Sequence, residues 1–175
     1  MGRHKTNLKE KIYDAYIELL EDAEGIEDNV SITDICDRAF VSRVSYYRAY
    51  NNKKEIIRDH LDAYMEEYHR NNPLSKDMSL NEILYHILNV AYDNQRLIRL
   101  LYKKDVVRKE IFLDNEYHDK LTKSISSISA NPESYENTFY MGAVIAVINK
   151  WVNNECKEPL EEILSMLIEH VSRPN

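Results

Sequence analysis

Apolar residues recur at every third or fourth position along most of the chain, and charged or polar residues fill the positions between them. This spacing is typical of amphipathic α-helices, and no stretch shows the strict alternation of a β-strand. The pattern predicts an all-α fold of eight or nine helices, over residues 7–24, 32–39, 43–49, 53–70, 80–102, 105–127, 132–154 and 160–171.

Several helix starts are marked by a capping side chain that is followed three residues later by an acid. Such pairs stand at Ser31–Asp34, Asn52–Glu55 and Ser79–Glu82. Thr6 is the expected cap of the first helix. The polar stretch 71–77 stops the fourth helix, and we therefore predict a boundary between two parts of the chain there.

Length, charge and composition narrow the range of functions. The chain has 175 residues and a net charge of −7, which excludes a uniformly basic nucleic-acid binder but permits a local basic patch. Its three glycines lie too far apart for the phosphate-binding loops G-x-x-x-x-G-K and G-x-G-x-x-G. Cys36 and Cys156 make neither a disulfide framework nor a zinc set, and we expect both to be buried free thiols.

The sequence offers neither a targeting segment nor a membrane span. The basic N-terminus is not followed by the apolar region of a signal peptide. The longest nearly apolar run, residues 139–148, is about half the length of a membrane span, which needs about 20 residues. We therefore expect a cytoplasmic protein with no membrane partner.

No catalytic or metal-binding constellation is recognisable. Glu66 and His69 have the spacing of metal ligands, but a helical di-iron site needs that motif twice. There is no G-x-S-x-G elbow for a nucleophilic serine. Several aromatic residues would suit a ligand cavity but are explained equally well as core, namely Tyr85, His86, Tyr92 and Tyr102. We expect no enzyme, no cofactor and no metal.

The segment 31–57 has the pattern of a helix-turn-helix. Two short helices, 32–39 and 43–49, are separated by a turn of three residues, and their apolar faces run on from one to the other. We expect Tyr46 and Tyr50 to point into the core and Tyr47 to point outward.

This segment is also the most basic part of an acidic chain. Six basic residues and one acid lie between Arg38 and Arg58, a local charge of +5, and the first eleven residues carry +3. Clusters of cations of this kind bind phosphates, while the acidic remainder discourages unspecific binding.

The residues from Ser31 to Glu55, SITDICDRAFVSRVSYYRAYNNKKE, resemble the DNA-binding signature of the tetracycline-repressor (TetR) family. The likeness covers residues 5–60. It implies an N-terminal three-helix DNA-binding domain at residues 1–58 and a helical dimerisation and effector domain at 59–175. It further implies a transcriptional regulator, most often a repressor, that binds a palindromic operator as a homodimer and is released by a small molecule.

The resemblance also assigns roles to individual side chains. It implies phosphate contacts for Ser31, Thr33, Ser42, Tyr47 and Lys53, major-groove contacts for Arg43, Val44 and Ser45, and either role for Arg48. An arginine in the major groove can bridge guanine O6 and N7, which gives about 1–3 kcal/mol of discrimination.

Three positions depart from the family signature. Phe40 replaces the usual turn glycine, Cys36 replaces a common alanine, and Ala49 replaces a common histidine or tyrosine. If position 40 keeps a positive φ, the phenylalanine is strained by about 1–2 kcal/mol.

The C-terminal part predicts a homodimer. Residues 142–151, with the stretch 154–163 after them, resemble a subgroup that includes dihydroxyacetone-kinase regulators. Residues 139–148 are apolar on all sides, so one side needs its own domain and the other a partner subunit. The expected interface residues are Phe139, Ala143, Ala146, Val147, Leu160, Leu164 and Leu167.

A second hypothesis is a helical protein-interaction module that has lost sequence-specific DNA binding. Phe40 in the turn and the acidic net charge favour it. The operator, the effector and its binding residues, and the sign of regulation are not specified by the sequence.

Overall fold

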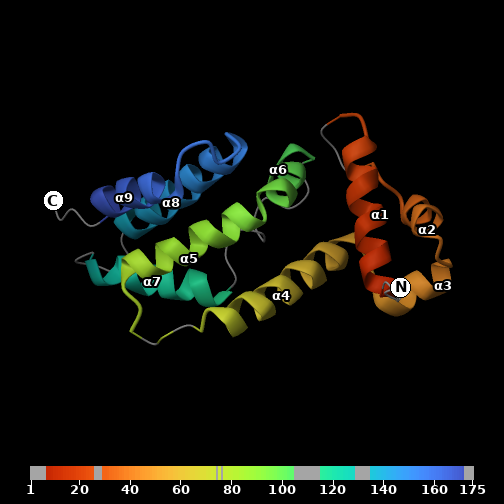
Figure 1. Cartoon of the computed structure of the whole chain (residues 1–175), viewed down its shortest axis with the longest axis horizontal. Helices are drawn as coiled ribbons and strands as arrows, with labels where there is room; N and C mark the ends of the chain where they lie inside the picture. Colours follow the sequence, from red (N-terminus) through yellow and green to blue (C-terminus); the bar gives the residue numbers. More distant parts are fainter. Residues whose placement is uncertain are drawn as a thin grey trace, which may run out of the picture. The chain divides into compact units, whose positions relative to one another are not determined.

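The structure is a computed structural model that describes residues 7–25, 29–73, 75, 77–104, 115–128 and 135–171. Within these ranges the chain forms nine helices and no strand, which confirms the predicted all-α fold (Figure 1). The helices are α1 Leu8–Asp22, α2 Ile32–Ala39, α3 Arg43–Ala49, α4 Lys53–Asn71, α5 Leu80–Asp93, α6 Gln95–Lys103, α7 Asn115–Ile128, α8 Tyr135–Asn153 and α9 Leu160–Val171.

The chain divides into two compact units. Unit 1 consists of Met1–Pro73 with Lys103–Val106, and unit 2 of Leu74–Tyr102 with Val107–Asn175. The main division falls inside the polar stretch 71–77. The expected DNA-binding domain, residues 1–58, contains α1, α2, α3 and the first turns of α4, whereas all of α4 groups with unit 1.

Unit 1 is built around α1, which contacts α2, α3 and α4 (Figure 1). The buried side of α1 is formed by Ile12, Tyr16 and Leu20, which meet apolar side chains such as Ile35 and Ile56 in a common core. Burial of each such apolar side chain stabilises the folded state by about 1.5–3 kcal/mol. The first helix is capped by Asn7 in a capping box with Glu10, so the expectation that Thr6 is the cap was wrong.

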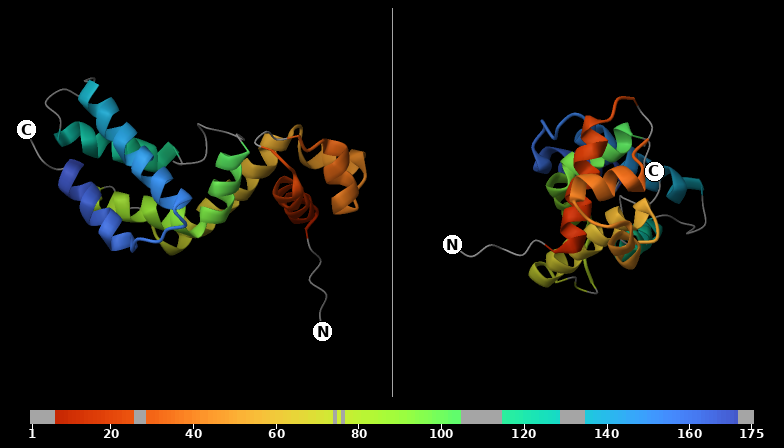
Figure 2. Two further views of the ribbon diagram at one scale, coloured as in Figure 1. Left: turned by 90° about the horizontal axis from the view of Figure 1, so that it is seen from above. Right: turned by 90° about the vertical axis from the view of Figure 1, so that its right-hand side faces the viewer.

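Unit 2 is a helical bundle in which α5 contacts α7, α8 and α9, and α8 contacts both α7 and α9 (Figure 2). Leu84 and Leu88 of α5 and Trp151 and Val152 of α8 are almost completely buried. The Trp151 indole donates a hydrogen bond to the Glu158 carbonyl at 2.9 Å, which fixes the turn between α8 and α9.

The single helix predicted over residues 80–102 is instead two helices, α5 and α6, separated at Asn94. Asn94 is buried, and its side-chain amide donates to the Val90 carbonyl at 2.9 Å, to which its backbone N–H also donates at 3.1 Å. Asn89 makes the same side-chain bond to Tyr85 inside α5 at 2.8 Å without ending the helix, so this bond alone does not account for the interruption at Asn94.

Two sequence signals lie outside the described residues. These are the first part of the helix predicted over 105–127, of which α7 is the described portion, and the helix start signal at 131–133. Among the helices that the structure describes, none has both the length and the apolar content that a bilayer crossing requires.

Candidate nucleic-acid interface

The segment 31–50 forms the predicted pair of short helices, with the predicted bounds (Figure 1). α2 begins at a capping box. The Ser31 hydroxyl accepts from the Asp34 N–H at 3.1 Å, and the Asp34 carboxylate accepts from the Ser31 N–H at 3.0 Å. The Ser31 hydroxyl also donates to the Asp34 carboxylate at 2.6 Å, and this bond, together with the one from the Ser31 N–H, lowers the pKa of Asp34. Ser31 and Thr33 are both exposed at this end of α2.

The turn between α2 and α3 is closed by a Schellman motif. The Val41 N–H donates to the Cys36 carbonyl at 3.0 Å, and the Phe40 N–H donates to the Asp37 carbonyl at 3.3 Å. This motif places one residue in the left-handed region, where glycine is usual. Here that residue is Phe40, with φ 54° and ψ 46°. The backbone strain of about 1–2 kcal/mol anticipated for this position is therefore present.

α3 divides into a buried face and an outward face. Tyr46 and Tyr50 are buried in unit 1, whereas Tyr47 is 49 % exposed, so all three predictions for these tyrosines are confirmed. Since residues four apart share a helix face, Arg43 and Val44 line up with Tyr47 and Arg48. All four are exposed.

The Ser42 hydroxyl caps α3 by accepting from the Ser45 N–H at 3.0 Å, and the two hydroxyls lie 2.9 Å apart. Ser42 is exposed and Ser45 is half-buried. The residues predicted to meet DNA from α3 and its cap are thus brought onto one edge of unit 1. The buried Tyr46 and Tyr50 anchor this edge to the core.

The cations of the basic segment fall into two groups. Arg43 and Arg48 are exposed, and neither forms an ion pair within the described part of the chain. Arg38 instead pairs with Glu18 at 3.2 Å and with Asp22 at 3.1 Å. Its charge links α2 to α1, so the local charge of +5 overstates what faces outward.

Lys53 is held against unit 1. Its ammonium donates to the Val30 carbonyl at 2.6 Å and lies 5.9 Å from the centre of the Tyr16 ring. This contact joins the start of α4 to the residues just before α2.

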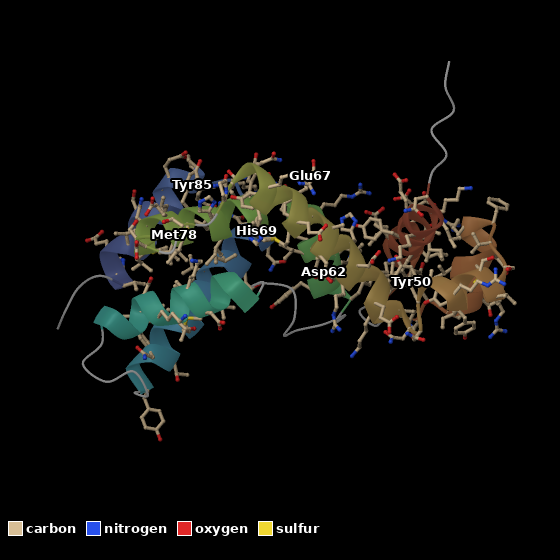
Figure 3. The ribbon with its side chains drawn as sticks, turned by 90° about the horizontal axis from the view of Figure 1, so that it is seen from below. Tyr50, Asp62, Glu67, His69, Met78 and Tyr85 are labelled. Atoms are coloured by element: carbon tan, nitrogen blue, oxygen red, sulfur yellow. The ribbon has the colours of Figure 1, made fainter. Side chains whose placement is uncertain are left out.

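A second polar cluster ties α1, α3 and α4 together. Figure 3 labels Tyr50, whose hydroxyl donates to Asp59 at 2.9 Å. The Lys9 ammonium binds the other oxygen of Asp59 at 2.5 Å. Burial raises the pKa of Asp59, but hydrogen bonds from Lys9 and Tyr50 outweigh it, so the net pKa shift is downward. Lys9 is one of the cations among the first eleven residues, and its charge is therefore neutralised by Asp59.

The predicted dimer residues lie on α8 and α9 of unit 2, which pack against each other. On α8, Phe139 is 69 % exposed and Ala146 is also exposed, whereas Val144 and Ile148 are buried. Ala143, Val147, Leu160 and Leu164 are half-buried, and Leu167 is buried inside its own protomer.

A cleft of about 350 Å³ lies between α8 and α9 on this apolar side. It is lined by Ala146, Val147, Lys150, Trp151, Asn154, Glu158, Ile163 and Met166. No cluster of three or more histidine, cysteine, aspartate or glutamate side chains suited to a metal ion occurs among the residues that the structure describes.

Comparisons with known proteins agree with this architecture. A TetR family model described as "Transcriptional regulator C-terminal region" matches residues 78–173, more than half of the chain. The crystal structure of a TetR transcriptional regulator from Streptococcus agalactiae 2603V has a similar fold, with a TM-score of 0.61 and 20 % sequence identity. The match covers 95 % of this chain and 94 % of that one. A search of curated proteins found no match.

The α2 and α3 pair is a helix-turn-helix, and the match to the C-terminal region of a transcriptional regulator gives the class of the protein. The chain belongs to the TetR family of transcriptional regulators.

Proposed function

We propose that the protein is a repressor that binds a palindromic operator as a homodimer and inserts α3 into the major groove. The observation that carries this proposal is the outward face of α3, where Arg43, Val44, Tyr47 and Arg48 are exposed over a buried pair of tyrosines. A recognition helix needs one face packed against its own domain and the opposite face exposed to the DNA, and α3 has both.

Each exposed group has a matching partner on DNA. The Arg43 guanidinium bridges guanine O6 and N7, and Val44 packs on a thymine methyl. The Tyr47 and Ser42 hydroxyls bind phosphates on the rim of the groove, which sets the register of the helix. Ser31, Thr33, Ser45, Arg48 and Lys53 complete the proposed contact surface.

The proposed dimer uses the apolar side of α8 and α9. Exposed Phe139 and Ala146 and the half-buried Val147 and Leu164 leave apolar surface in contact with solvent, and a second copy of the chain would cover it. A two-fold dimer of this family design places its two recognition helices about 34–36 Å apart, one turn of DNA.

A small-molecule effector is proposed to bind unit 2. Two buried polar atoms there, Thr122 Oγ1 and Asn149 Oδ1, make no hydrogen bond within the described residues. Buried polar atoms require such a partner, which a ligand or a water supplies. The effector acts on DNA affinity only through its different affinities for the DNA-bound and released arrangements.

The test is to sequence the genomic fragments that the purified protein selects and then to measure binding of the selected site. Arg43→Ala and Tyr47→Phe should weaken binding. Arg70→Ala is the matched control, because it removes a charge from the exposed last turn of α4. Unchanged binding by both α3 variants would overturn the site assignment, and the protein-interaction hypothesis would replace it if no fragment is selected.

A further inference from the structure

Phe40 has two unusual structural features, one in its backbone and one in its side chain. Its backbone is left-handed, with φ 54° and ψ 46°. Its side chain is also 95 % exposed, more than any of the other large apolar residues exposed in unit 1. The ring forms no ring–ring contact with the rest of the described chain. A residue that is both strained and unpacked gains nothing from the folded protomer alone, which points to a partner outside it.

The surroundings of Phe40 indicate which partner. Phe40 lies two residues before Ser42, the cap of α3, and three before the exposed Arg43. It follows the last turn of α2 directly, at the turn that can be seen in Figure 1. Val44, the next apolar residue on the outward face of α3, is 64 % exposed. The turn that carries the ring thus leads directly into α3, whose outward face is assigned to DNA under the proposed function.

A polyanion fits this edge better than a protein surface, because the apolar groups are flanked by the guanidinium groups of Arg43 and Arg48. DNA also supplies apolar surface at the rim of the groove, on deoxyribose carbons and thymine methyls, and phenylalanine is among the side chains that use it. In a helix-turn-helix the first helix crosses the backbone and the second enters the groove, so the turn between them lies at that rim.

We propose that Phe40 is a DNA-contacting residue, whose ring packs on the deoxyribose surface beside the phosphate that Ser42 holds. This inference rests on the proposed DNA binding and adds an apolar contact to it. The inference predicts that a single substitution, Phe40→Gly, has two opposite effects. Removal of the ring weakens operator binding, and relief of the left-handed strain stabilises the fold. Strain that is retained at a functional site shows this opposition.

The experiment measures operator affinity and thermal stability for four variants of the full chain. Phe40→Gly and Phe40→Asn both suit a left-handed backbone and both remove the ring. Each should weaken operator binding about tenfold, equivalent to about 1.4 kcal/mol, and Phe40→Gly should also raise the Tm. Phe40→Tyr keeps an aromatic ring and should bind within about threefold of the native protein. The salt dependence of binding should stay unchanged in Phe40→Gly, because no cation is lost.

The fourth variant, Phe40→Trp, reports the contact directly. The chain has one tryptophan, Trp151, which is buried. The added exposed indole should be quenched by acrylamide in the free protein and protected by the operator.

Operator binding by Phe40→Gly and Phe40→Asn at native strength, or an indole in Phe40→Trp that stays fully accessible on the operator, would overturn the inference. Neither outcome contradicts the proposed function. That function is tested separately, by operator binding of the native protein and the loss of this binding in Arg43→Ala. If the native protein binds no DNA, both proposals fail together.

Discussion

Replacing Phe40 with glycine should make the folded protein more stable, although glycine substitutions usually destabilise. The left-handed backbone at φ 54° costs a side chain with a Cβ about 1–2 kcal/mol. Against this, glycine adds about 0.4–1 kcal/mol of conformational entropy to the unfolded chain. The ring itself is 95 % exposed, so its removal forfeits almost no packing.

The difference between these terms spans about 0–1.6 kcal/mol, and its midpoint is a stabilisation of about 0.8 kcal/mol. For a chain of this length that unfolds in one transition, it corresponds to a rise in Tm of about 1–4 °C. Urea denaturation measures the same change as a higher midpoint with an unchanged slope. Phe40→Ala is the matched control, because alanine removes the ring but keeps the Cβ that causes the strain. Its stability should stay close to that of the native protein.

A loss of stability in Phe40→Gly would refute this reasoning, because it would mean that the ring is packed in the folded protein. Equal stabilisation by Phe40→Gly and Phe40→Ala would also refute this reasoning. The destabilisation by Phe40 would then come from its exposed ring and not from its left-handed backbone.

Three further outcomes are expected. Tyr50→Phe should lower the free energy of unfolding by about 1 kcal/mol in urea titrations. The substitution removes the hydrogen bond that the Tyr50 hydroxyl donates to Asp59, whereas the bond from Lys9 to Asp59 remains. An unchanged free energy of unfolding would mean that water replaces the lost bond fully. Burial lowers the pKa of His60 in the folded state below the usual histidine value of 6.5. The unfolded chain therefore takes up the proton first, and the free energy of unfolding should fall as the pH drops below about 6.5; His60→Gln should weaken this dependence, and an unchanged profile would refute the assignment. Ala146→Glu places a charge on the apolar side of α8 and should shift the protein to monomers in sedimentation experiments; an unchanged oligomeric state would place the dimer contact elsewhere.

The helix-turn-helix could be predicted closely from the sequence because its determinants are local. Ser31 and Ser42 each cap a helix through residues three positions away, and the bounds of α2 and α3 agree with the prediction. The left-handed turn was a conditional expectation that rested on the family resemblance, in which position 40 is usually glycine. In contrast, the apolar period continues smoothly across Asn94, so the pattern predicts one helix where the structure has the break between α5 and α6.

The candidate site was less predictable wherever the partner of a side chain is distant in sequence. Arg38 meets acids on α1 that precede it by 16 and 20 residues, and Lys9 meets Asp59 across 50 residues. A count of charges along the sequence includes both cations in its basic clusters, although each is paired with an acid in the fold. An apolar stripe is ambiguous in the same way, because it does not specify whether its partner belongs to the same chain. Leu167 of α9 is buried within its own protomer.

The central claim is that the cations around α3 bind the phosphates and base edges of an operator. Equilibrium binding of a selected operator over a series of salt concentrations tests it most directly, since each neutralised phosphate contributes about −0.9 to the slope of log K against log salt. A dimer that brings two or three cations per protomer should give a slope of about −3.6 to −5.4, and loss of Arg48 should make the slope shallower. A slope near zero, or the same slope for Arg48→Ala, would contradict the account.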